Sequence, residues 1–265
     1  MIVYPNAKIN LGLHILNKRP DGYHNLETIF YPVNWKDILE IIPASKDSFS
    51  SSGIPIPGDP SANLCIKALQ IMRKDFPIPP VSMHLHKMIP HGAGLGGGSS
   101  DATHTLKALN SLFQLGLSPQ ALADYALQIG SDCPFFVQNT PMLATCRGEI
   151  LTPVNIDLSS YKIIIVYPGI QISTAQAYTK VKPKDKRKTI SDIVRLPNSQ
   201  WKKELKNDFE SALKKDFPAL AQIKKKLYNA GAAYASLSGS GSAVYGIFKG
   251  EIPVISWPNE YQVKV

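Results

Sequence analysis

The chain has 265 residues, of which 44% are hydrophobic, and it carries 29 lysines and arginines against 20 aspartates and glutamates. This composition is typical of a globular protein and excludes an intrinsically disordered or fibrous chain. Because no apolar run approaches the roughly 18 residues of a membrane-spanning helix, we expect no membrane partner.

The net charge of +9 is concentrated in one segment of the chain. Residues 180–226 carry 15 Lys or Arg and 6 Asp or Glu, whereas the remaining residues carry 14 of each sign. No aromatic residues alternate with these charges, so a solvated surface is favoured over a nucleic-acid site. We therefore expect no nucleic-acid partner.

Strand and helix patterns are mixed through the first half of the chain. Strands are predicted over four stretches: 1–15, 25–35, 38–42 and 81–86. Helices are predicted over three stretches: 61–74, 99–113 and 118–129. Pro32 is expected to break the second strand, and Asp21-Gly22 to form a turn. The Ser-, Pro- and Gly-rich segment 43–60 is predicted to be a loop, with Ser61 as the cap of the helix after it.

The strand and helix patterns stop around residues 152–160, where Pro, Asn, Asp and Ser predominate. This change in composition indicates a domain boundary near residue 155. We therefore predict two domains, residues 1–155 and 156–265. The second is predicted to contain a buried strand, two helices and a final strand: 161–167, 199–215, 218–229 and 243–248. Because strands and helices do not alternate regularly, the pattern favours an α+β fold over a doubly wound sheet.

The strongest functional pattern lies between a predicted strand and a predicted helix. It runs Pro90, His91, Gly92, Ala93, Gly94, Leu95, Gly96, Gly97, Gly98, Ser99 and Ser100. Glycines let backbone N–H groups converge on a ligand, and the following helix points its free N–H groups and positive dipole end into the loop. The pattern predicts a polyphosphate site, to which the serines add hydroxyl donors or a Mg²⁺ ligand. The alternative is a flexible turn with Ser99 as an ordinary helix cap.

This loop differs from the two commonest phosphate-binding loops. No lysine follows the glycines, which excludes a Walker A loop. Gly92, Gly94 and Gly97 match GxGxxG, but no second strand ending in an acidic residue follows about 20 positions later. A dinucleotide-binding fold is therefore disfavoured.

Two charged residues, Lys8 and Asp132, have neighbours in the sequence that suggest a functional site. Lys8 lies among apolar and amide residues in the segment 5–11, where a lysine is desolvated unless an anion faces it. The alternative is an edge-strand lysine whose ammonium group reaches water. Asp132 lies in the segment 130–136, either as a carboxylate aimed into a cleft or as a helix cap close to a first-turn proline.

Two further segments have the composition of binding loops. Tyr23 and His24 follow the Asp-Gly turn and suit a planar heterocycle, although both rings could simply pack against the loop. Residues 238–242 read Ser-Gly-Ser-Gly-Ser, which is typical of a flexible turn or of a backbone nest for an anion.

In this order, the motifs resemble those of the GHMP small-molecule kinases. The resemblance is carried by five segments: 5–11, 19–24, 90–102, 130–136 and 238–241. It extends from the first strand to the last and is weak over 43–58 and 180–226. The Asp-Gly-Tyr-His element narrows the resemblance to members that act on a cytidine diphosphate substrate. Lys18 and Asn139 stand where many members have glycine, and both are loop positions away from the expected chemistry.

The resemblance implies a two-domain α+β fold with the active site between the domains. The N-terminal domain would be like domain 2 of ribosomal protein S5, and the C-terminal domain would be ferredoxin-like. The implied reaction moves the γ-phosphate of ATP, with Mg²⁺, to the 2-hydroxyl of a cytidine diphosphate methylerythritol in the non-mevalonate isoprenoid pathway.

The resemblance also implies roles for residues that match the family motifs. Lys8 and Asp132 match the catalytic pair, residues 90–100 the ATP phosphate loop, and Asn63 and Leu64 the adenine contacts. The positions that match the substrate side are Asn10, Tyr23, His24, Thr174, Tyr178, Ser240 and Gly241.

Two other functions remain open at this point. One is a GHMP kinase for a sugar, homoserine or mevalonate derivative, against which Tyr23, His24 and Tyr178 argue. The other is a non-enzymatic RNA-binding protein, which would not need Lys8, Asp132 and the glycine loop together. We expect a monomer or weak homodimer. Three cysteines without paired spacing and the lack of a secretory signal favour a cytoplasmic location.

Overall fold

The computed structural model describes residues 1–265, and the chain packs into two compact units that alternate along the sequence. The first unit comprises residues 1–8, 32–91 and 96–140, and the second comprises residues 9–31, 92–95 and 141–265. The chain passes between them within β2 (Asn6–Lys18), at β3 (His24–Lys36) and in the glycine loop. The boundary between these two compact units therefore does not lie at residue 155. The boundary between the family's two domains near residue 155 stays a prediction.

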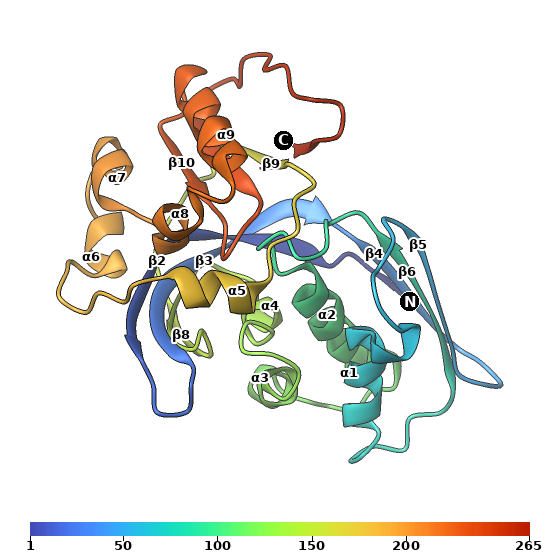
Figure 1. Cartoon of the computed structure of the whole chain (residues 1–265). Helices are drawn as coiled ribbons and strands as arrows, with labels where there is room; N and C mark the ends of the chain where they lie inside the picture. The colour runs from blue at the N-terminus through green and yellow to red at the C-terminus, as the bar shows by residue number, and fades with distance from the viewer. The chain divides into compact units, whose positions relative to one another are not determined.

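The first unit is a four-stranded sheet with helices against one face (Figure 1). Its strands are β1 (Ile2–Val3), β4 (Ile38–Pro43), β5 (Ser48–Gly53) and β6 (Val81–Lys87), in the order β1-β4-β6-β5. Its helices are a 3₁₀ turn (Pro60–Ala62), α1 (Leu64–Met72), α2 (Gly97–Leu112), α3 (Pro119–Leu127) and α4 (Phe135–Gln138).

Alternating burial explains why this sheet is covered on one face only. Leu39 of β4 pairs with Leu85 of β6, and Ile41 pairs with Met83; all four are buried in one core with α1 and α2. The intervening residues of both strands are polar or partly exposed. Burying each of these apolar side chains contributes about 1.5–3 kcal/mol, so the two-residue period fixes which face the helices cover.

The second unit contains two four-stranded sheets. The first has the order β2-β3-β7-β8, with β7 at Met142–Cys146 and β8 at Ile150–Pro153. The second has the order β10-β11-β9-β12, with β9 (Tyr161–Tyr167), β10 (Tyr234–Leu237), β11 (Val244–Lys249) and β12 (Gln262–Lys264). The helices are α5 (Thr174–Lys180), α6 (Ile190–Val194), α7 (Asn198–Glu204), α8 (Asp208–Leu213) and α9 (Pro218–Asn229).

Helix α9 shows how this unit forms its core. Leu220, Ile223 and Leu227 are spaced three and four residues apart, and all three are buried against β10 and β11. Lys225 and Lys226 are exposed on the solvated side of the helix, whereas Lys224 is half-buried and pairs with Glu210. The mixture of sheets and helices confirms the predicted α+β class.

Two predictions about the first strands were wrong. β3 runs through Pro32 without a break, and Pro32 lies beyond residues 26–30, so the pairing with β7 needs no N–H from this residue. The segment predicted as a loop contains β5, which pairs in parallel with β6. Its sequence is almost all serine, so it lacks the apolar alternation from which strands are predicted.

Two helix predictions also require correction. Asn63, not Ser61, caps α1, because Ser61 lies inside the 3₁₀ turn that precedes the helix. The helix predicted over 199–215 is two helices, α7 and α8, since Asn207 has extended backbone angles and caps α8 through its side chain.

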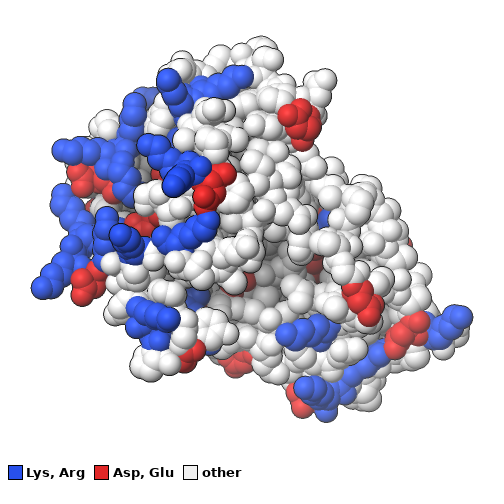
Figure 2. Space-filling model, viewed as in Figure 1, with Lys and Arg blue, Asp and Glu red and all other residues white.

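The uneven charge distribution is visible on the surface. Lys and Arg side chains gather over the part of the second unit that carries α6 to α9 (Figure 2). Much of this segment is exposed, as predicted, but Arg187 forms an ion pair with Asp208 in which both side chains are mostly buried. None of the helices combines the length and apolar character that crossing a bilayer needs.

Candidate active site

The glycine loop leads into a helix whose start has no side-chain cap. α2 begins at Gly97, and its cap residue Gly96 is left-handed, with φ 69°. Ser99 therefore lies inside the first turn, and the alternative that it caps the helix is wrong. The first N–H groups of a helix lack partners within it, so this uncapped end presents several donors and a positive dipole to an anion.

The glycine loop lies directly against the second glycine-rich segment. The Ser238 hydroxyl donates a hydrogen bond to the Gly94 carbonyl at 2.8 Å, and the Ala243 N–H donates to the Ala93 carbonyl at 3.0 Å. A Cβ on Gly94, which has φ +77°, would lie 2.0 Å from the Ser238 carbonyl oxygen. Only glycine permits this approach. The two loops, predicted separately from sequence, thus form one surface.

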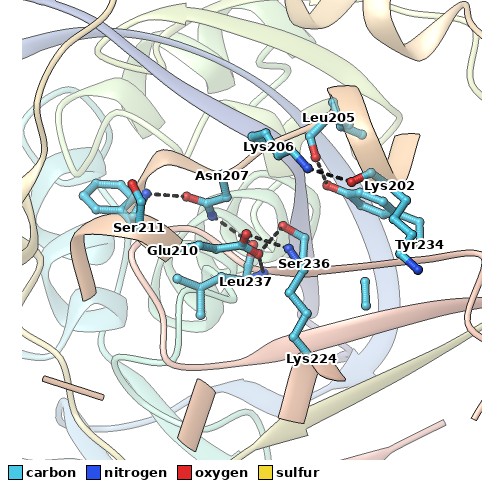
Figure 3. A network of polar contacts seen from close by, with 12 residues as sticks. Lys202, Leu205, Lys206, Asn207, Glu210, Ser211, Lys224, Tyr234, Ser236 and Leu237 are labelled. Carbon is cyan, nitrogen blue, oxygen red and sulfur yellow. Dashed lines mark hydrogen bonds and ion pairs between the residues drawn. The ribbon is translucent and has the colours of Figure 1, made fainter. Parts of the chain in front are cut away.

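A buried polar network holds the second loop in place (Figure 3). The Asn207 side-chain amide donates to the carbonyls of Leu237 and Gly239, both at 2.9 Å. Glu210 accepts a hydrogen bond from the Leu237 N–H at 3.0 Å, and its other carboxylate oxygen accepts from Lys224 at 2.6 Å. Because these contacts fix both sides of residue 238, the loop has a defined shape.

Lys8 and Asp132 lie together in the first unit. Lys8 is 5% exposed on β2, and burial lowers its pKa to about 8, while the nearby charge of Asp132 acts in the opposite direction. The Ser99 hydroxyl donates a hydrogen bond to Asp132 Oδ1 at 2.8 Å. An ammonium group, a carboxylate and the start of α2 are thus brought to one place.

Local packing explains how two distant segments converge there. The side-chain amides of Asn6 and Asn139 donate hydrogen bonds to each other, at 3.1 and 2.7 Å. Asn139 has φ 57°, a left-handed conformation that asparagine tolerates better than most residues other than glycine. A Cβ on Gly96 would lie 3.1 Å from Lys8, so Lys8 packs directly beneath the start of α2.

Asp132 is not a helix cap. Pro134 precedes α4, and no side chain caps this helix. The Asp132 carboxylate instead accepts a hydrogen bond from the Ser99 hydroxyl, and its direction into a cleft stays a prediction.

Asn63 and Leu64 line a cavity of about 310 Å³ in the first unit. Other lining residues are His91 and Gly98 of the glycine loop and Phe49 of β5. The cavity thus joins the predicted adenine contacts to the phosphate loop. Its size is that of a small-molecule site.

In the second unit, His24 and Tyr178 form a stacked pair. Their ring centroids are 5.1 Å apart with an interplanar angle of 24°, and Phe209 packs edge-on against Tyr178 at 5.0 Å. Burial raises the pKa of Tyr178 to about 12. Burial, followed by the charge of Lys18, lowers the pKa of His24, so its imidazole is neutral at pH 7. The two rings together form an aromatic surface, and the neutral imidazole of His24 can make hydrogen bonds.

The other predicted substrate residues also lie in the second unit. Tyr23 is 58% exposed, and the Arg147 guanidinium lies over its ring at 5.2 Å. The Asn10 side chain donates a hydrogen bond to the Thr28 hydroxyl at 2.9 Å, which keeps this buried amide oriented. The hydroxyls of Thr174 and Ser240 are 3.1 Å apart, so helix α5 contacts the second glycine-rich loop.

Two groups of functional candidates escaped the sequence analysis. Lys87, the last residue of β6, makes a buried ion triad with Asp37, between β3 and β4, and with Asp101 of α2. Asn207 supports the second loop but lies in a basic segment that resembled a solvated surface. A buried strand that ends in lysine was the one available signal for the triad, since such a lysine requires anionic partners.

Comparisons with known proteins agree with this geometry. Family models described as "GHMP kinases N terminal domain" and "GHMP kinases C terminal" match residues 63–139 and 189–255. A protein named 4-diphosphocytidyl-2-C-methyl-D-erythritol kinase from Cytophaga hutchinsonii is 52% identical, over 94% of this chain and 92% of that protein. A relative of the same name from Azobacteroides pseudotrichonymphae is 50% identical, over 94% of each chain.

Solved structures give the same result. A crystal structure of 4-(cytidine 5'-diphospho)-2C-methyl-D-erythritol kinase is 31% identical, with a TM-score of 0.79 and coverage of 94% of this chain and 91% of that one. The mevalonate kinase of Methanococcus jannaschii, 16% identical with a TM-score of 0.68 over 94% and 90%, shares the fold alone. The chain belongs to the GHMP kinase family.

Proposed function

We propose that the chain transfers the γ-phosphate of ATP to the 2-hydroxyl of 4-diphosphocytidyl-2-C-methyl-D-erythritol in the non-mevalonate isoprenoid pathway. The observation that carries the proposal is the contact between Ser99 and Asp132, beside Lys8, at the uncapped start of α2. Relatives about 50% identical over most of the chain bear the name of this kinase. The family favours this enzyme over the RNA-binding alternative.

Asp132 is the proposed general base. Phosphoryl transfer requires alignment of the groups, neutralisation of charge and a proton acceptor, and it needs little covalent chemistry from the protein. The Asp132 carboxylate takes the proton from the attacking hydroxyl, while Ser99 holds the carboxylate in one orientation. The Lys8 ammonium stabilises the ionised carboxylate and the charge on the transferred group.

The ATP phosphates are assigned to the glycine loop and the start of α2. The donors are backbone N–H groups of residues 91–100, since Pro90 has none, and Gly94 gives the second loop close access to them. The cavity at Asn63 and Leu64 would take the adenine. Mg²⁺ supplies charge neutralisation when it is bound with ATP. The Ser99 hydroxyl is an oxygen ligand of the kind this ion accepts and would hold it, which leaves the Asp132 carboxylate as the base.

The cytidine is assigned to residues of the second unit. Tyr178 offers a stacking surface, and the neutral His24 ring can both donate to and accept from a cytosine edge. Asn10, Tyr23, Thr174, Ser240 and Gly241 complete the proposed substrate side.

A panel of acceptors tests this proposal. Purified protein with Mg-ATP should phosphorylate the cytidine diphosphate substrate with a kcat/KM at least about 10³-fold above that for homoserine, mevalonate or galactose, since the remote base supplies binding energy that positions the hydroxyl. Comparable values for one of those acceptors would overturn the assignment within the family.

A further inference from the structure

A buried ion triad lies beside the glycine loop in the first unit. Lys87 Nζ donates to Asp37 Oδ2 at 2.5 Å and to Asp101 Oδ2 at 2.6 Å. Asp37 is fully buried, and Lys87 and Asp101 are each 3% exposed. Burial acts to lower the pKa of Lys87, but the charges of Asp101 and Asp37 raise it above its usual value, so the amine is protonated at neutral pH. The triad is therefore an ammonium group held between two carboxyl groups.

The triad joins the two chain segments that flank the loop. Lys87 is the last residue of β6, just before the loop, and Asp101 lies near the start of α2, just after it. Asp37 Oδ1 accepts hydrogen bonds from the backbone N–H groups of Met88 and Ile89, at 2.6 and 2.8 Å. These two residues lead into the loop. The segment before the loop and the helix after it are thus bound to the same buried group.

The start of α2 also packs tightly against the end of β6. A Cβ on Gly97, the first residue of α2, would lie 2.9 Å from Ile89 Cγ2 and 3.1 Å from Lys87 Nζ. Glycine permits this close approach because it has no side chain. The Lys87 ammonium therefore sets where the first N–H groups of α2 lie relative to the residues that enter the loop.

Stability alone does not explain three buried ionisable groups. Moving charges out of water costs free energy that their mutual attraction often fails to recover, and apolar side chains of similar volume commonly replace such groups without loss of stability. Farther along α2, Leu106 and Leu109 already hold the helix in an apolar core with α1. The triad adds defined distances, because each of its hydrogen bonds joins one atom before the loop to a fixed partner.

The loop is a segment that needs fixed ends. Gly92, Gly94 and Gly96 all have positive φ, and glycine loses more conformational freedom than any other residue when it is ordered. Ordering a loop around a ligand lowers the affinity, and a loop that is held in its binding conformation beforehand avoids part of this cost. Contacts that fix the two ends of the loop are therefore expected to tighten the binding of its ligand.

We propose that Lys87, Asp37 and Asp101 are positioning residues that hold the two ends of the glycine loop at the separation required to bind the phosphates of ATP. The inference rests on the proposed ATP site. The triad acts through Met88 and Ile89 on one side of the loop and through the start of α2 on the other.

Dissociation constants of ATP and adenosine, measured by calorimetry at pH 8, test the inference without an acceptor substrate. Burial raises the pKa of Asp101 to about 7, so its carboxyl group is mostly ionised at pH 8. Lys87 and Asp101 also line the cavity at Asn63, which is proposed to take the adenine. The ratio of the adenosine constant to the ATP constant cancels any effect on adenine alone and measures what the phosphates contribute.

Three variants are compared with the wild type. Asp101→Ala removes the link to α2 and leaves the pair of Lys87 and Asp37 intact. The ratio should fall by about 10–100-fold, since a misplacement of about 1 Å can cost about 10²-fold. Asp101→Asn keeps an oxygen for the Lys87 ammonium, so the ratio should stay within about threefold of the wild-type value. Leu109→Ala destabilises α2 without touching the triad and should also keep the ratio.

Four results would overturn the inference. They are an unchanged ratio in folded Asp101→Ala, an equal fall in Leu109→Ala, an equal fall in Asp101→Asn, and a wild-type ratio near one. Asp101→Leu, which fills the space with an apolar side chain, replaces the alanine variant if that protein does not fold. If neither protein folds while Asp101→Asn does, the triad maintains the fold itself, and the inference fails.

The outcome separates this inference from the proposed function. If the ratio changes as expected but the wild type does not phosphorylate the cytidine substrate, the function fails and the role of the triad stands. If the wild type phosphorylates the cytidine substrate and the ratio is unchanged in Asp101→Ala, the role of the triad fails and the function stands.

Discussion

Ser99 donates a hydrogen bond to Asp132 at 2.8 Å, although the two residues are 33 positions apart in the sequence. Ser99 belongs to the first turn of α2, which follows the glycine loop, and Asp132 to the turn before α4. The contact brings a carboxylate to the helix end where an anion would bind. Packing within the first unit therefore sets the position of the Asp132 carboxylate relative to the start of α2, where the phosphates are proposed to bind.

The ionisation of Lys8 predicts an alkaline limit to activity. Burial lowers the Lys8 pKa to about 8, so the free enzyme loses this positive charge as the pH rises through that value. The pH profile of kcat/KM for ATP should fall above about pH 8. In Lys8→Arg the guanidinium stays charged, and the fall should move beyond pH 10 in whatever activity remains. A wild-type profile flat to pH 10 would contradict the role of Lys8.

The same residue is expected to cost stability. A lysine with its pKa lowered from 10.5 to about 8 is destabilising while it is charged in the fold, by about 3 kcal/mol at 1.36 kcal/mol per pKa unit. Lys8→Met should therefore raise the free energy of unfolding at pH 7 by up to that amount while removing activity.

The pH dependence provides the control for this prediction. Below pH 8, Lys8 is charged in both the folded and the unfolded protein, so the full difference in free energy of unfolding between Lys8→Met and the wild type is present. Between pH 8 and 10.5, Lys8 is neutral in the folded protein and charged in the unfolded one, and this difference becomes smaller. Urea unfolding at pH 7 and pH 10 measures the difference. A Lys8→Met protein that is less stable at pH 7 would contradict the burial penalty.

Tyr178 should contribute to cytidine binding and little to ATP binding. Tyr178→Ala removes the stacking surface and should weaken binding of the cytidine substrate by about 1–3 kcal/mol, as for other base–aromatic contacts. Tyr178→Phe keeps the ring and is the matched control, with near-normal affinity expected. Calorimetry with each ligand distinguishes the effects. Equal losses for ATP and the cytidine substrate in Tyr178→Ala would argue against the assignment.

Most of the basic segment is expected to be dispensable. Lys184, Lys186 and Lys188 are exposed, and their joint replacement by Gln should lower the isoelectric point and change kcat/KM by less than about threefold. Arg187 differs, because its guanidinium pairs with Asp208, whose carboxylate also accepts the Ile15 N–H at 2.8 Å. Arg187→Gln should lower the free energy of unfolding by about 1–3 kcal/mol.

Thermal unfolding and steady-state kinetics together check both halves of this prediction. A hundredfold loss of kcat/KM in the triple variant would mean that the lysines order the substrate site. An Arg187→Gln protein as stable as the wild type would mean that the ion pair contributes nothing.

The sequence predicted those parts of the site that local chemistry marks. Five glycines at a strand-to-helix junction require an unusual backbone, so the loop and the start of α2 could be located without a structure. β5 could not, because its serines pair with Ser82, His84 and His86 of β6 through hydroxyl contacts that leave no apolar alternation. The triad around Lys87 was also missed, since its partners come from segments 50 and 14 residues away.

Phosphorus NMR of the wild-type protein and Asp132→Asn, each with Mg-ATP and the cytidine diphosphate substrate, tests the central claim most directly. The wild type should convert ATP to ADP with the appearance of a new phosphomonoester. Asp132→Asn keeps the shape of the side chain but loses the base, so the same resonance should appear about 10²–10⁴-fold more slowly while both ligands still bind. A near-normal rate in Asp132→Asn, or no phosphomonoester from the wild type, would contradict the account.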